Sequence, residues 1–231
     1  MGQMQPFTDQ RLAGYCAFCG GLPSTKDHVP PRIFLDLPHP EIYPIIGACL
    51  DCNRGASLDE EYVACLLEVA ACGTVDPANL RRQKIARTLE KRPALAAQLA
   101  KSLKPGGEFS VRREDRARLS AVLEKTARGL WAYEVGETAQ SSLATVRYAQ
   151  IAEFRDEQLE AFIALEQPDL LPEVGSRMMI RVLTATDKVE GSWIELQAGR
   201  FSYGIEVFSG DGRVKMILGE YIAAEVTLAI S

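Results

Sequence analysis

The sequence lacks several features that would place it in a class at once. No run of about 20 residues is apolar enough to cross a membrane, and residues 1–14 lack the apolar core of a secretory signal. Histidine is scarce, with two in 231 residues, and aromatic residues make up 7%. The net charge is −5, which by itself argues against nucleic-acid binding. We therefore expect a cytoplasmic protein with no membrane partner.

The composition is otherwise that of a globular chain, 47% hydrophobic and 25% charged. Its length predicts one domain with an appendage, or two modest domains. The charge is uneven: residues 76–130 carry 14 Lys/Arg and 6 Asp/Glu, the residues before them 4 and 9, and those after them 8 and 16. Such a basic middle indicates either a track for phosphate groups or a solvated helix face that pairs with the acidic tail.

Local patterns predict helices in the first two thirds of the chain. Residues 57–60 have capping-box spacing, and the apolar periodicity that follows predicts a helix from 57 to Gly73. Asp76 followed by proline predicts a second helix, to about residue 91. Two more helices are expected, one from 93 to before 105 and one over 114–132, followed by a strand at 143–151 and a short acidic helix at 156–166.

The tail has a different pattern. Short β-type runs are separated by turns, several of which contain glycine, and they predict an antiparallel meander over 176–231. The expected strands are 178–184, 192–197, 201–208, 213–218 and 221–230.

Four of the six cysteines form two pairs, Cys16-x-x-Cys19 and Cys49-x-x-Cys52. A gap of two residues lets both sulfurs of a pair bind one ion, and two such pairs make a closed tetrahedral site. We therefore predict one structural zinc ion, against the alternative of four unrelated buried cysteines. The other two cysteines, seven residues apart on the first predicted helix, are expected to be core thiols.

The residues around these pairs resemble a known family. Residues 26–32 read Lys-Asp-His-Val-Pro-Pro-Arg, and Asn53 directly follows the last cysteine. Cys-x-x-Cys, Asp-His-Val-Pro and Cys-x-x-Cys-Asn in this order resemble the zinc-containing HNH endonuclease motif. Residues 26–62 are also similar to a group of bacterial HNH-type proteins.

The resemblance implies a ββα-metal fold, in which a hairpin and a helix surround one divalent cation. His28 would be the general base that activates water to attack a phosphodiester. Asp27 and Asn53 would ligate Mg²⁺ or Mn²⁺. A neutral imidazole suits the base, and a hard cation stabilises charge on the phosphate. The alternatives are a packing histidine, an aspartate that caps a turn and an asparagine in a turn.

The fold class predicted is therefore α+β, in three parts. Residues 1–75 form a zinc-stabilised ββα-metal (HNH, treble-clef-like) module, 76–135 a basic helical segment, and 136–231 an α+β region with an antiparallel β tail. Six basic residues are candidates for nucleic-acid contact: Arg32, Arg54, Arg81, Arg82, Lys84 and Arg87.

Three functions remain open. The first is a metal-dependent HNH-type endonuclease acting on nucleic acid, with DNA favoured. The second is a catalytically degenerate zinc module that binds nucleic acid or a protein; it is supported by residues 41–47, where the family has an Asn and this chain has neither Asn nor His. In the third, the zinc module is a clip and the β tail is an interaction surface for a protein partner or an oligomer.

Overall fold

The computed structural model describes residues 14–104, 110–166, 174, 176–184 and 193–229, and they form an α+β fold. The strands are β1 (Thr25–His28), β2 (Ile45–Ala48), β3 (Gln140–Gln150), β4 (Ile194–Gln197), β5 (Phe201–Val207), β6 (Asp211–Leu218) and β7 (Ile222–Ala229). The helices are α1 (Leu50–Gly55), α2 (Ser57–Cys72), α3 (Gln83–Lys91), α4 (Pro93–Ala100), α5 (Arg113–Val135), α6 (Asp156–Ile163) and α7 (Arg177–Thr184).

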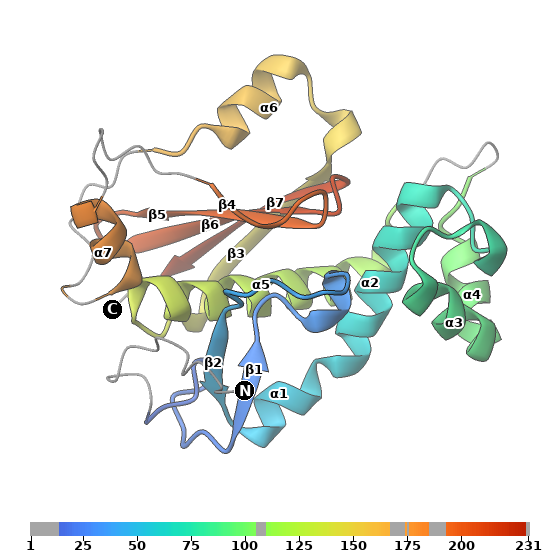
Figure 1. Cartoon of the computed structure of the whole chain (residues 1–231). Coiled ribbons are helices and arrows are strands. Elements are labelled where there is room, and N and C mark those ends of the chain that lie inside the picture. The colour runs from blue at the N-terminus through green and yellow to red at the C-terminus, as the bar shows by residue number, and fades with distance from the viewer. Residues whose placement is uncertain (1–13, 105–109, 167–173, 175, 185–192, 230–231) are drawn as a thin grey trace.

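Helix α5 lies at the centre of the molecule, between the β1–β2 hairpin on one side and the large sheet on the other (Figure 1). It ends at Gly136, whose φ of 87° lies in the left-handed region that favours glycine. Its last seven residues are all buried, because two layers pack against it. No described helix, α5 included, combines the length and the apolar character that a bilayer span needs.

The C-terminal sheet has five antiparallel strands in the order β3-β7-β6-β5-β4. Four of them come from the tail, so the predicted meander is confirmed there. Gly210, with φ 92°, makes the turn from β5 to β6. Helix α6 lies over the face of the sheet that is turned away from α5 (Figure 1).

Contact between α5 and the sheet depends on a glycine in β6. Trp131 of α5 is fully buried, and a Cβ built on Gly212 would lie 2.2 Å from two of its ring atoms. The indole therefore fills the space above the glycine, and no side chain can be added there without moving α5 or the strand.

Gly212→Ala is accordingly expected to lower the free energy of unfolding by about 1–3 kcal/mol through overpacking. Urea denaturation followed by tryptophan fluorescence measures this. Gly55→Ala is the control, because nothing lies within 4 Å of a Cβ at that position. Equal stability of Gly212→Ala and the parent protein would show that the contact does not limit packing.

A second glycine lets the hairpin approach the opposite side of α5. A Cβ on Gly129 would lie 2.7 Å from Val29 and 3.1 Å from Ile46, which are both buried. Because this close approach excludes larger residues, α5 is held between the hairpin and the sheet by its two contacts, Gly129 on one face and Trp131 on the other.

Three local predictions were wrong, two of them at helix starts. Residues 178–184 are not a strand but belong to α7, because Ser176 Oγ accepts a hydrogen bond from Met179 N and starts a helix. The predicted helix at 76–91 begins with a single 3-10 turn, Pro77–Asn79, and α3 starts only at Gln83.

The capping box at Ser57 does not form. Helix α1 ends immediately before α2, so Ala56 is the N-cap and Ser57 Oγ instead donates to the Arg54 carbonyl. The end of α2 is as predicted, with Gly73 at φ 65°.

Candidate functional site

The four paired cysteines come together in space. Their Sγ atoms all lie within 4.8 Å of one another, and Cys19 Sγ is 3.8 Å from Cys49 Sγ. Sulfurs placed about 2.3 Å from a tetrahedral zinc would be roughly 3.8 Å apart. The cluster therefore fits a metal ion such as zinc in both distance and donor chemistry.

Local backbone structure builds each half of this cluster. In the first half Cys16 N donates to Gly21 O, and Gly20 N donates to Cys16 O around a left-handed glycine. In the second half Cys49 is the N-cap of α1, and its sulfur accepts from Cys52 N. The pairing of β1 with β2 brings the halves together, since its register ends at Ala48, just before Cys49.

The protonation of the thiols differs across the cluster. Burial raises the pKa of Cys16, but hydrogen bonds from the backbone of Cys49, Cys19 and Phe18 outweigh it and bring that pKa to about 7. Burial and the neighbouring thiols raise the pKa of Cys52 far above its usual range. Four thiolates in this space thus require a cation among them.

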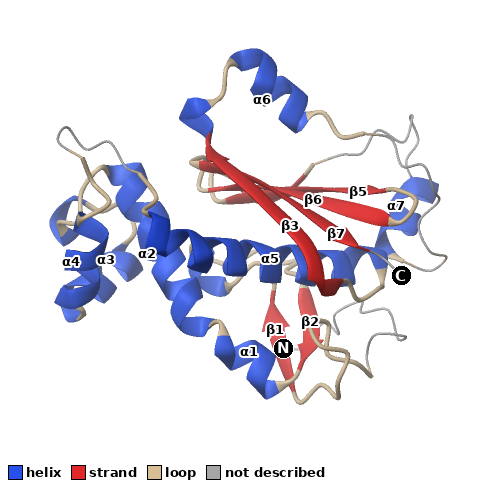
Figure 2. Ribbon diagram, turned by 180° about the vertical axis from the view of Figure 1, so that it is seen from behind, coloured by secondary structure: helices blue, strands red, loops and turns tan. Residues whose placement is uncertain are grey.

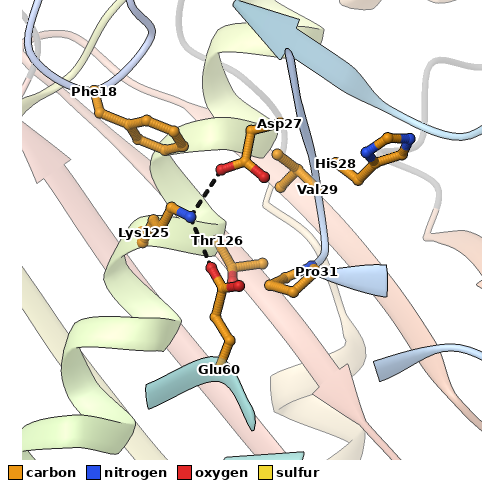
Figure 3. A pocket seen from close by; sticks show the side chains of 8 residues that line it. All are labelled: Phe18, Asp27, His28, Val29, Pro31, Glu60, Lys125 and Thr126. Carbon is orange, nitrogen blue, oxygen red and sulfur yellow. Dashed lines mark hydrogen bonds and ion pairs between the residues drawn. The ribbon is translucent and has the colours of Figure 1, made fainter. Parts of the chain in front are cut away.

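Next to the cluster, the Asp27 carboxylate belongs to a buried ion triad (Figure 3). Asp27 is 9% exposed, and Lys125 Nζ lies 2.7 Å from its Oδ2 and 2.7 Å from Glu60 Oε1. Burial lowers the pKa of Lys125, but the two carboxylates outweigh this and raise it. Burial also raises the pKa of Glu60 against the opposing effect of Lys125.

Lys125 and Glu60 were not predicted as site residues. Lys125 lies on the apolar stripe of α5, one turn from Val122 and from Gly129, and a lysine in that place signals a buried partner. Glu60 was considered only as an acid in the first turn of its helix. The side chains around the triad close the cleft so tightly that they leave no space for a water molecule.

His28 points away from the triad, as adjacent residues of a strand do (Figure 3). Arg32 Nη2 lies 2.7 Å from His28 Nε2, and the ring packs edge-on against Tyr43 at 5.1 Å. Because arginine only donates, Nε2 must be the unprotonated acceptor. Burial, followed by the charge of Arg32, lowers the pKa of His28.

Asn53 links α1 to β1. Its amide nitrogen donates to Thr25 Oγ1 at 3.0 Å and to Lys26 O at 3.2 Å. The structure thus places Asn53 against the strand that carries Asp27 and His28, although the three side chains have different contacts. A shared cation among them stays a prediction.

The predicted nucleic-acid contacts divide into two groups. Five of the side chains are exposed: Arg32, Arg54, Arg81, Lys84 and Arg87. Arg82 is 8% exposed, and its guanidinium donates to Asp36 Oδ1 and to the Ile33 and Leu35 carbonyls. The structure gives Arg82 a task other than the predicted one, which is to hold the loop after β1 against the start of α3.

No protein-family model matches the chain, and no curated protein or solved structure matches it. Its function is therefore argued from the geometry of the cysteine cluster and of the residues around it.

Proposed function

We propose that the chain is a metal-dependent HNH-type endonuclease that hydrolyses phosphodiester bonds in nucleic acid, with DNA as the favoured substrate. One observation carries the proposal. The antiparallel pair β1–β2 is followed directly by α1, with the thiol cluster where the elements meet. This order supports a ββα-metal module and puts His28 at the end of β1 and Asn53 in the helix.

In this proposal the four cysteines hold zinc. An all-thiolate set leaves no coordination position for substrate, so the zinc is structural and the reaction takes place elsewhere. Its task is to fix β1 relative to α1.

His28 is the general base. Its Nε2 lone pair accepts the proton of the attacking water once Arg32 releases it. Arg32 and the exposed Arg54 bind the phosphate oxygens, since guanidinium groups match the geometry of phosphate. Arg32 thereby exchanges one acceptor, His28, for a charged one.

Asp27 and the Asn53 side-chain oxygen would hold Mg²⁺ or Mn²⁺, for which carboxylate and amide oxygens are suitable ligands. When bound, the cation would stabilise negative charge on the phosphate and on the leaving oxygen. The Lys125 ammonium already lies beside Asp27 and acts as a stand-in cation, which supports this carboxylate as a place for positive charge. Lys125 has to withdraw before a metal ion can bind there.

The second candidate is a zinc module that binds nucleic acid or a protein without cutting. The observation that favours it is the same ion pair. Asp27 is already neutralised by Lys125, and the closed cleft has no space for water. If Lys125 never withdraws, the chain lacks the cation and keeps only its binding surface.

A plasmid-nicking assay with Mg²⁺ or Mn²⁺ separates the two candidates. His28→Ala is expected to reduce cleavage about 100-fold or more, the usual loss for a general base, while zinc stays bound. His39→Ala, which replaces the other histidine, is the matched control. Cleavage by His28→Ala at the parental rate would remove His28 from this role, and DNA binding without any cleavage by the parent protein would favour the second candidate.

A further inference from the structure

A groove of about 540 Å³ lies between the first turns of α5 and the end of β3. Figure 2 shows β3 crossing α5 on the sheet side of the helix. Most of the groove is lined by polar and charged side chains, and its volume falls within the range of sites for small molecules. The residues that carry the argument are Arg116 and Ser120 of α5 with Arg147, Tyr148, Gln150 and Glu153 at the other wall.

Two arginines from different elements converge on this groove. Within the part of the chain that the structure describes, neither Arg116 nor Arg147 has an ion-pair partner. Neighbouring arginines of α5 do have partners, since Arg118 pairs with Asp59. Two guanidinium groups on one groove repel each other, so a bound anion would stabilise both.

An aromatic ring lies between these charges. Tyr148 is half-buried, and burial raises the pKa of its phenol while the charge of Arg116 opposes the shift. The field of Arg116 therefore reaches the ring. Glu153 adds an acceptor for an amino group, and Ser120 adds a hydroxyl.

We propose that this groove binds a phosphate-bearing nucleotide, with Arg116 and Arg147 on the phosphate and Tyr148 against the base. Arginine pairs bind phosphate through charge-assisted hydrogen bonds, and a base stacks on an aromatic ring irrespective of sequence. The nucleotide can be a free nucleoside phosphate or one unit of a single strand. The aromatic platform between two guanidinium groups favours a nucleotide over an acidic peptide.

The groove is separate from the cleft at Asp27. Arg116 and Lys125 are nine residues apart on α5, which at about 100° per residue places them on opposite faces of the helix. Arg116 faces the sheet side and Lys125 the hairpin. The inference does not depend on the proposed cleavage, and the two can fail independently.

Fluorescence anisotropy with a labelled single-stranded oligodeoxynucleotide of about ten nucleotides tests the proposal on the full chain. No divalent cation is added, so cleavage does not interfere. Unlabelled adenosine monophosphate is the competitor for the free-nucleotide source. We expect Arg116→Gln/Arg147→Gln to weaken binding by about tenfold or more and to reduce the salt slope by about 2. Circular dichroism checks that this variant is folded.

Arg113→Gln is the matched control, because Arg113 is exposed on the same helix but does not line the groove. It should bind within about twofold of the parent, as should His28→Ala. Tyr148→Ala should weaken binding and Tyr148→Phe should not. Competition by the monophosphate identifies a free nucleotide as sufficient, and its absence identifies a strand. Equal losses in Arg113→Gln and the double variant, equal competition by poly-glutamate, or no binding of either probe would overturn the proposal.

Discussion

Replacing Cys49 by serine is expected to release the bound metal and to unfold the hairpin and α1. Cys49 supplies one of four clustered sulfurs and is also the N-cap of α1, so its loss removes a ligand and weakens a helix start. In small zinc domains the binding of structural zinc contributes about 10–16 kcal/mol to folding. The N-terminal segment has only two short strands here, and without the metal little else holds β1 to α1.

The effect is read as zinc content together with amide hydrogen exchange of β1 and β2, which should lose protection while the five-stranded sheet keeps it. Cys72→Ser is the control, since Cys72 lies outside the cluster. A Cys49→Ser protein with full protection in the hairpin would show that apolar packing alone folds this segment.

The second large effect is expected from Lys125→Met. The ammonium holds Asp27 and Glu60 together, and all three side chains are between 12% and 14% exposed. Removing one partner of a buried ion pair leaves an uncompensated charge, which typically costs about 3–5 kcal/mol. Here two carboxylates lose their cation at once, so we expect a loss in that range.

Chemical denaturation of the zinc-loaded protein measures this loss. Lys91→Met, an exposed lysine of α3, should change stability by less than about 0.5 kcal/mol. Adding Asp27→Asn and Glu60→Gln to Lys125→Met should recover most of the stability, because no buried charge is then left. A Lys125→Met protein as stable as the parent would mean that the triad is not a stabilising unit.

Local chemistry made much of the fold predictable. The apolar periodicity before Gly73 and the turn at Gly210 are signals within a few residues, and α2 and the β5–β6 turn follow them. The failures came where a signal had a competitor. The β-type run at 178–184 is overridden by Ser176, which starts a helix, and the box at Ser57 is displaced by the end of α1.

The candidate site was only half predictable for the same reason. The cysteine spacing is local, and the predicted cluster forms. Lys125 reaches Asp27 from 98 positions further along the chain, through the packing of α5 on the hairpin, and no local pattern shows that. Arg82 is likewise drawn into the interior by Asp36, although its neighbours in the basic segment are exposed.

The central claim is that one zinc ion binds to the four paired cysteines and positions β1 against α1. Zinc-edge X-ray absorption on the purified full chain tests it most directly. The account predicts one zinc per chain with four sulfur neighbours at about 2.3 Å and no nitrogen or oxygen ligand. A chain that carries no metal, or zinc with mixed ligands and fewer than four sulfurs, would contradict it.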